Sequence, residues 1–103
     1  MKIQEVVWLL GADEDLASIF EIEVDLTGDC PRANQLMKEI ETQLHHLLQF
    51  PLMGRRINNS LRRVLIGKQR YGLYYAVESN RVVVHAILNL QLPPHQIKYR
   101  LDL

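Results

Sequence analysis

The sequence predicts one α+β domain, residues 1–103, with two antiparallel helices packed on one face of a small, mostly antiparallel four-stranded sheet. A length of 103 residues with 48% apolar content suffices for one hydrophobic core and is too short for two ordinary domains. A proline–glycine stop at Phe50–Gly54 separates two segments with helical apolar spacing from three strand-like runs. The predicted order is therefore strand, helix, helix and three strands.

The first strand is predicted over Lys2–Leu9, because this segment is rich in β-branched and aromatic residues. Gly11 is expected to end it. Asp13 is then expected to cap a helix, since its carboxylate can accept hydrogen bonds from the first free amides. The apolar stripe of this helix consists of Leu16, Ile19, Phe20 and Val24.

The second helix is predicted to follow the linker Thr27–Pro31, with Pro31 as its first residue after a polar cap. Pro51 must end this helix, because the residue before a proline is disfavoured in helical geometry. The apolar stripe consists of Leu36, Met37, Ile40, Leu44, Leu47 and Leu48. The two stripes are expected to make the helices pack side by side.

Three strands are predicted after Gly54, over Leu61–Ile66, Tyr71–Glu78 and Arg81–Gln91. Ser79–Asn80 is expected to form a two-residue hairpin turn, because Asn tolerates a positive φ better than most residues. The last two strands are therefore predicted to be antiparallel neighbours.

Alternation along the last strand predicts two distinct faces. The face expected to pack against the helices contains Val82, Val84, Ala86, Leu88 and Leu90. The face expected to stay partly open contains Val83, His85, Ile87, Asn89 and Gln91. Pro93–Pro94 should stop the strand, stiffen the tail 93–103 and hold it away from the sheet.

Charge is divided unevenly along the chain, although the formal net charge is zero. Residues 1–51 contain three basic and ten acidic residues, whereas residues 52–103 contain nine basic and two acidic residues. This division favours an acidic partner for the second half of the chain. The alternative is that folding places acidic helices in solvent opposite a basic sheet.

Cysteine and histidine content indicates the compartment and the chemistry. Cys30 is the only cysteine, so no internal disulfide can form, which fits a reducing compartment such as the cytoplasm. The segment Met1–Leu10 is too short to span a bilayer and is interpreted as neither a signal peptide nor a membrane anchor. His45 and His46 lack a second ligand one turn along the helix, so no metal or other cofactor is expected.

Several short motifs stand in a consistent order between residues 6 and 91. They are Trp8 before Ala12, the pair Asp15–Leu16 with Ile19, and the segments Phe50–Gly54, Leu61–Arg63, Tyr74–Val77 and Val82–Leu90. In this order and spacing they resemble the RelE/ParE superfamily of toxins from type II toxin–antitoxin systems. The resemblance implies a small toxin that a cognate antitoxin protein neutralises.

Two targets are known for such toxins: ParE-like members bind DNA gyrase, and RelE-like members cleave mRNA at the ribosome. The resemblance implies that a RelE-like, metal-independent endoribonuclease would use a cluster of Arg and Lys with a Tyr or His near the C-terminus. At the positions of two usual arginines this chain has Gly72 and the stretch Asn89–Leu92. We therefore predict a ParE-like, gyrase-binding toxin without catalytic residues. A ribosome-dependent mRNA endonuclease and a non-toxic binding relative are the alternatives.

Ten residues are candidates for binding the target or the antitoxin. They form a central group, Arg55, Arg56, Arg62, Arg63, Lys68 and Arg70, and a tail group, His95, Lys98, Tyr99 and Arg100. Arginines at strand ends are also often solvated and pair with nearby acids. His95 is the one candidate acid–base group near the tail.

The sequence leaves the assembly open between a homodimer and a toxin–antitoxin hetero-oligomer. Tyr71 and Tyr75 are expected to pack in or near the core rather than stack on bases. Deleting residues 95–103 is expected to abolish growth inhibition and to leave the fold intact.

Overall fold

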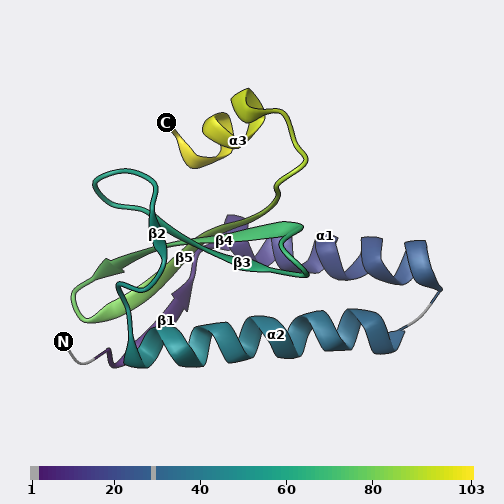
Figure 1. Ribbon diagram of the computed structural model, residues 1–103, viewed down its shortest axis with the longest axis horizontal. Coiled ribbons are helices and arrows are strands. Elements are labelled where there is room, and N and C mark those ends of the chain that lie inside the picture. The colour runs from purple at the N-terminus through teal and green to yellow at the C-terminus, as the bar shows by residue number, and fades with distance from the viewer. Residues whose placement is uncertain (1–2, 29) are drawn as a thin grey trace.

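The computed structural model describes residues 3–28 and 30–103, which form an α+β fold (Figure 1). Its elements are β1 (Glu5–Trp8), α1 (Leu10–Thr27), α2 (Cys30–Gln49), β2 (Arg55–Arg56), β3 (Arg62–Ile66), β4 (Tyr71–Glu78), β5 (Arg81–Asn89) and α3 (Pro94–Leu101). The strand order is β1-β5-β4-β3-β2, with β1 parallel to β5 and all other neighbours antiparallel. In Figure 1, α1 and α2 run antiparallel on one side of the sheet and α3 lies on the other.

The predicted fold class is confirmed, but the sheet has five strands rather than four. The additional strand is β2, a two-residue edge strand in which Arg55 lies opposite Arg63 and Arg56 opposite Arg62. Two arginines between a glycine and an asparagine-rich loop show no apolar alternation. The sequence therefore carries no strand signal at this position.

The first helix begins earlier than predicted. The backbone N–H groups of Ala12 and Asp13 donate to Leu9 O at 3.0 and 3.1 Å, so α1 already starts at Leu10. Asp13 lies in the first turn and is not the cap, and Leu9 makes no side-chain capping bond. Two parts of the sequence predictions, Lys2 in the first strand and Asp29 in the cap before Pro31, lie outside the described residues.

Helix α1 ends at a glycine cap and α2 ends at the predicted proline stop. Gly28 adopts the left-handed conformation, with φ of 61°, and its N–H donates to Val24 O at 2.7 Å. Helix α2 begins at Cys30, one residue before the predicted start, and ends at Gln49. The two helices therefore turn back on each other over a very short connection.

The main core lies between α1, α2 and the sheet. Its buried members are Ile3, Ala12, Ile19, Leu36, Ile40, Leu47, Val64, Ile66, Tyr71, Leu73, Tyr75, Val82, Val84 and Ile87. Tyr71 and Tyr75 are buried, as predicted. At about 25 cal/mol for each Å² of apolar surface removed from water, this cluster is the main stabilising contribution to the fold.

A β-bulge at His85 interrupts the predicted alternation along β5. Tyr75 lies opposite Val84 and Tyr74 lies opposite Ala86, so His85 is the extra residue on its strand. The hairpin turn that joins β4 to β5 is as predicted, because Ser79 and Asn80 both have positive φ, 51° and 62°.

After the bulge, the two faces of β5 exchange. Ile87 packs in the main core under the helices, whereas Ala86 and Leu88 pack on the opposite face. The sequence-based assignment of these three residues was therefore wrong. Strict alternation cannot detect a one-residue insertion, since each slip moves every following side chain to the other face.

Helix α3 packs on the face opposite α1 and α2, over a second apolar cluster. Leu101 is buried there, with Ile97 partly buried beside it. The other buried members of the cluster are Leu61, Tyr74, Ala76, Ala86 and Leu88. The expectation that Pro93–Pro94 would hold the tail away from the sheet was wrong. Pro94 instead begins α3, where its fixed φ suits a first helical position.

This packing also changes what a tail deletion would test. Without residues 95–103, the chain loses Leu101 and Ile97, and the apolar cluster beneath α3 faces water. A truncated chain would therefore lose stability as well as any binding surface on the tail. The structure therefore argues against the expectation that such a deletion leaves the fold intact.

The turn after α2 depends on a close approach between Gly54 and Tyr75. The Tyr75 hydroxyl donates to Pro51 O at 2.8 Å and accepts from Gly54 N at 3.0 Å. A Cβ atom at position 54 would lie 2.6 Å from the Tyr75 hydroxyl oxygen, closer than any real contact. Only glycine fits between the turn and this buried side chain.

We predict that Gly54→Ala lowers the free energy of unfolding by about 1–3 kcal/mol, because the added methyl group must displace the buried Tyr75 ring. The matched control is Gly11→Ala in α1, where an added Cβ meets no atom closer than 4.0 Å. The control should be neutral or slightly stabilising, since Ala favours helix more than Gly does. Urea unfolding of both variants checks this, and equal stability of the two would contradict the packing argument.

Candidate functional site

The ten predicted binding residues do not form one surface. The structure places them in three groups: an arginine edge (Arg55, Arg56, Arg62 and Arg63), the turn between β3 and β4 (Lys68 and Arg70), and α3 (His95, Lys98, Tyr99 and Arg100). Only the four arginines of the arginine edge lie directly together. Lys68 follows Arg63 by five residues along β3 and the turn after it. At the usual rise of about 3.3 Å per strand residue, this is a separation of about 16 Å.

The arginine edge consists of two directly opposed pairs on β2 and β3. Arg62 is partly structural, because its Nη1 donates to Leu52 O at 3.1 Å and to Gly54 O at 3.0 Å. Arg56 Nε donates to Asn58 O at 3.1 Å. Among the described residues, no carboxylate forms an ion pair with any of these four arginines. Like charges placed directly opposite each other across strands are destabilising, so this arrangement favours an external acidic group.

A depression of about 440 Å³ lies beside the arginine edge, between α2 and β3. Its lining residues are Gln43, Met53, Gly54, Arg55, Arg63, Val64 and Leu65. Two polar side-chain atoms of this lining, Gln43 Oε1 and Arg63 Nε, are buried and have no hydrogen-bond partner among the described residues. Native proteins rarely leave such atoms unpaired.

An apolar patch adjoins this depression at the turn after α2. Phe50, Leu52 and Met53 are 64%, 56% and 44% exposed. They line a shallow hollow with Gln49 and Pro51. Clustered apolar side chains on a surface are typical of a protein-binding site.

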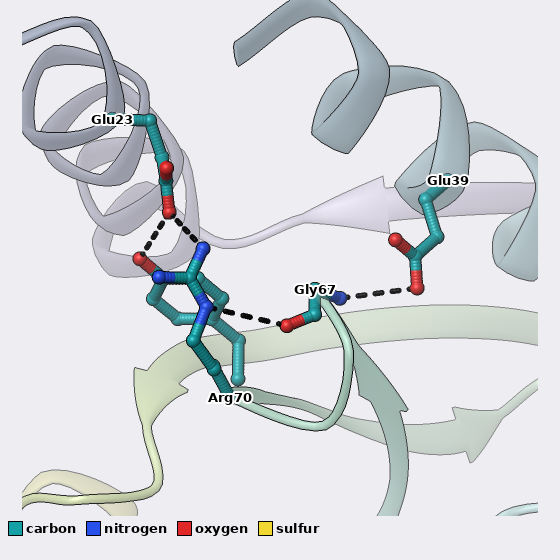
Figure 2. A network of polar contacts seen from close by, with 5 residues as sticks. Glu23, Glu39, Gly67 and Arg70 are labelled. Atoms are coloured by element: carbon teal, nitrogen blue, oxygen red, sulfur yellow. Dashed lines mark hydrogen bonds and ion pairs between the residues drawn. The ribbon is translucent and has the colours of Figure 1, made fainter. Parts of the chain in front are cut away.

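The turn between β3 and β4 is held between the two long helices by a polar network (Figure 2). Arg70 Nη2 lies 2.5 Å from Glu23 Oε1, and the Tyr71 hydroxyl donates to the same oxygen at 3.0 Å. On the other side, Gly67 N donates to Glu39 Oε1 at 3.0 Å. Arg70 therefore fastens the sheet to α1, and its charge is paired within the chain.

Lys68 stands at the tip of the same turn, where Gly67, Lys68 and Gln69 have φ of 63°, 55° and 69°. A run of left-handed residues is disfavoured outside glycine, and the contacts of Glu23 and Glu39 hold it in place. The Lys68 side chain is exposed. Together with Arg32 and Glu39, it lines a hollow with a mixed polar and apolar lining.

The charge on Arg100 is also used within the chain. Its Nη2 lies 2.7 Å from both carboxylate oxygens of Asp15, and Asp15 Oδ2 accepts a hydrogen bond from Ile87 N at 3.1 Å. Asp15 thus connects α1, β5 and α3. The motif residue Asp15 has a structural function here.

The remaining tail residues form one exposed face of α3. His95, Lys98 and Tyr99 are separated by three or four positions, which places them on one side of a helix. All three are exposed, and Tyr99 is 84% exposed. Because Leu101 and Arg100 fix the helix to the sheet and to α1, this face is held in a defined orientation.

The position at which a RelE-like nuclease usually has an arginine is crowded. A Cβ at Gly72 would lie 2.9 Å from Arg63 Cδ, 3.0 Å from Tyr74 Cε2 and 3.1 Å from Leu90 Cδ2. Gly72 is buried, and Leu90 packs against the cluster beneath α3. A larger side chain at position 72 would require these neighbours to move.

His45, His46 and His85 lie apart from these groups. His45 and His46 are exposed on α2, and His85 Nε2 lies 4.0 Å from Glu78 Oε2. In residues 3–28 and 30–103, no group of three or more His, Cys, Asp or Glu side chains is arranged to hold a metal ion. Over the same residues, no helix combines the length and hydropathy that a bilayer crossing requires.

Sequence reasoning missed Gln43, Met53 and Leu65 as parts of the depression beside β3. Gln43 stands in an amphipathic helix, where a polar residue is expected to be solvated. Leu65 belongs to a strand with ordinary alternation. Their proximity depends on how α2 crosses β3, and no local pattern indicates this.

Residues 6–90 match the family described as the ParE toxin of type II toxin-antitoxin system, parDE. The chain belongs to this toxin family. This match confirms the resemblance to the RelE/ParE superfamily and assigns the chain to its ParE-like members. No curated protein sequence matches the chain at a significant level.

A solved structure supports the fold of this ParE family member. It is described as the chromosomal ParDE TA system from P. aeruginosa, and its chain has a TM-score of 0.73 and 18% sequence identity to this one. The similarity covers 86% of this chain and 98% of that chain. At this level of identity the similarity shows the fold alone.

We predict that Tyr71→Phe reduces the loss of stability above pH 10. Burial, with the hydrogen bond to Glu23, raises the pKa of Tyr71 above its ordinary value of 10.0. The neutral phenol is thus favoured in the folded chain. The contribution of this buried phenol to the free energy of unfolding is complete below pH 10. It falls as the pH rises further, by up to about 1.4 kcal/mol per pH unit.

The measurement is the free energy of urea unfolding between pH 8 and pH 11. The wild type should lose stability more steeply above pH 10 than Tyr71→Phe does. Tyr99→Phe changes an exposed side chain and should leave the wild-type slope unchanged. Parallel curves for the wild type and Tyr71→Phe would contradict the argument.

Proposed function

We propose that this chain is the toxin of a type II toxin–antitoxin pair and that it inhibits growth by binding DNA gyrase through the exposed face of α3. The observation that carries this proposal is the fixed, solvent-facing set of His95, Lys98 and Tyr99. Membership in the ParE toxin family supports the toxin assignment. The crowded surroundings of Gly72 support a binding function over RelE-like cleavage.

The α3 face has the properties of a binding epitope. Tyr and cationic side chains contribute strongly to protein interfaces, because they combine apolar area with polar recognition. Leu101 and the Arg100–Asp15 ion pair hold α3 on the sheet before any partner arrives. A surface that is ordered in advance loses less entropy on binding.

The same proposal includes an antitoxin and a cytoplasmic location. The solved structure with the similar fold is described as a ParDE toxin–antitoxin system, which supports a partner protein for this chain too. Cys30 is a free, exposed thiol, and a reducing compartment preserves such a group. We infer a toxin–antitoxin hetero-oligomer as the resting form of the chain.

We predict that the double variant Lys98→Glu, Tyr99→Ala abolishes growth inhibition when the chain is expressed without its antitoxin. Both side chains are exposed and lie outside the apolar cluster under α3, so the fold should persist. The matched control is Gln96→Ala on the same helix, which should inhibit growth as the wild type does. Circular dichroism of the purified variants verifies that both are folded.

The phenotype of the wild-type chain distinguishes the possible targets. Filamentous cells with DNA damage, together with supercoiling by purified gyrase that the wild type inhibits and the double variant does not, support the proposal. Rapid translation arrest with cleaved mRNA would instead identify the ribosome, and not gyrase, as the target. Unaffected growth would refute toxicity.

A further inference from the structure

A small polar pocket lies at the loop that joins β2 to β3. This loop projects from the sheet on the side where α3 lies (Figure 1). The pocket has a volume of about 160 Å³, and the polar residues of its lining are Arg56, Asn58, Asn59, Ser60 and Arg62. None of the acidic residues that the structure describes lines it. The pocket therefore combines two positive charges with neutral polar groups.

Strand alternation separates the four arginines of the arginine edge into two pairs. Side chains directly opposite each other share a face of the sheet, and successive residues of one strand point to opposite faces. Arg56 and Arg62 accordingly line the polar pocket, whereas Arg55 and Arg63 line the depression between α2 and β3. The two pairs thus serve different surfaces of the molecule.

Both arginines of the pocket are held by one part of the guanidinium and keep other donors unused. Arg62 donates to the turn after α2 through Nη1 alone, and Arg56 donates to Asn58 O through Nε alone. A guanidinium carries several N–H donors in a planar fork. Arg62 Nε and Nη2 and both terminal nitrogens of Arg56 form no hydrogen bond or ion pair with any described residue. These donors are oriented and remain available to a bound molecule.

The loop that carries the neutral donors is also fixed. Asn58 Oδ1 accepts hydrogen bonds from Ser60 N at 2.8 Å and from Leu61 N at 2.7 Å. Leu61 is buried in the apolar cluster beneath α3. Asn59 and Ser60 therefore stand in a defined backbone, and no described residue forms a hydrogen bond with either side chain.

Size and charge select the ligand. Pockets that hold drug-sized molecules have volumes of about 300–1,000 Å³, so this pocket suits a compact ion instead. Its oriented donors and its positive charge require an anion that accepts several hydrogen bonds. The oxygens of a phosphate group point in tetrahedral directions and can meet donors on several sides, whereas a carboxylate accepts mainly in its own plane. Arginine is also the residue that binds phosphate in a bidentate manner.

We propose that the pocket between β2 and β3 is a binding site for a phosphate group. Arg56 and Arg62 supply its charged donors, and Asn59 and Ser60 supply its neutral donors. The group is either a free phosphate or a phosphodiester of the DNA backbone, which share this chemistry. The site lies on elements other than α3 and does not depend on the target proposed for the exposed face of that helix.

The first test adds inorganic phosphate to the purified chain at constant ionic strength and follows the backbone amides of Arg56, Ser60 and Leu61 by nuclear magnetic resonance. These amide signals should shift and saturate with phosphate and should not respond to chloride. Arg56→Gln should weaken phosphate binding at least about tenfold, because it removes charge-assisted hydrogen bonds. The matched control Arg55→Gln removes the same charge from the other face of β2 and should weaken binding less than about threefold.

The second test replaces inorganic phosphate with a short labelled DNA duplex and measures binding by fluorescence anisotropy at several salt concentrations. If the DNA backbone occupies the pocket, the duplex shifts the same loop amides. Arg56→Gln then lowers the slope of log affinity against log salt by about one. A response to inorganic phosphate alone identifies a free phosphate group as the ligand. Either result supports the site.

A further variant keeps the test valid if the loss of Arg56 disturbs the loop. Ser60→Ala leaves every charge in place and should weaken phosphate binding by about threefold, because it removes one neutral donor. Circular dichroism verifies the fold of each variant.

Three results would overturn the inference. The loop amides could fail to shift with either probe, or they could shift equally with chloride, which would show that no phosphate site exists. Arg55→Gln could also weaken binding as much as Arg56→Gln does. Equal weakening would indicate a diffuse attraction of anions to the arginine edge, without a defined pocket.

Discussion

A single bulged residue on β5 determines which side chains of the central hairpin face each of its two apolar layers. Before His85, the strand contributes Val82 and Val84 to the core under α1 and α2. After it, Ala86 and Leu88 turn to the opposite face, where Leu101 of α3 covers them. Without the extra residue, the side chains on one half of the strand would lie on the wrong face. Asp15 stabilises this region, since its carboxylate accepts the Ile87 amide and pairs with Arg100.

This two-sided construction explains why so many cations serve the fold. Arg70 joins the β3–β4 turn to α1, Arg100 joins α3 to α1, and Arg62 holds the carbonyl groups of the turn after α2. Each meets a carboxylate or a carbonyl of the chain itself. Among the predicted binding residues that the structure describes, Arg55, Lys68 and Lys98 have no ion pair to a carboxylate. The uneven charge along the sequence therefore reflects both packing and recognition.

The sequence was sufficient to predict those elements whose signals are local. The two amphipathic stripes, the Pro51 stop and the Ser79–Asn80 turn each depend on neighbouring residues, and each was predicted close to its observed position. Strand β2 and the bulge at His85 depend on pairing with distant residues. Nothing in the residue pattern encodes that pairing. The start of α1 was misplaced because a backbone cap at Leu9 leaves no side-chain signature.

The candidate site was predicted less completely, for a related reason. Basic residue types were identified, but the sequence could not separate Arg70 and Arg100, which are bound within the chain, from Lys68 and Lys98. The helix α3 was not predicted, since eight residues after two prolines give a weak helical pattern. The depression beside β3 depends on the placement of Gln43 over Leu65, and such a crossing appears only in three dimensions.

The hydrogen bonds of Tyr75 to Pro51 and Gly54 have an effect on the behaviour of the whole molecule in water. They fix the backbone of the turn after α2, so Phe50 and Leu52 cannot fold back into the interior. The exposure of these side chains therefore follows from the folded backbone of the turn itself. Covering this turn would remove an unfavourable contact between apolar side chains and solvent that the fold itself maintains.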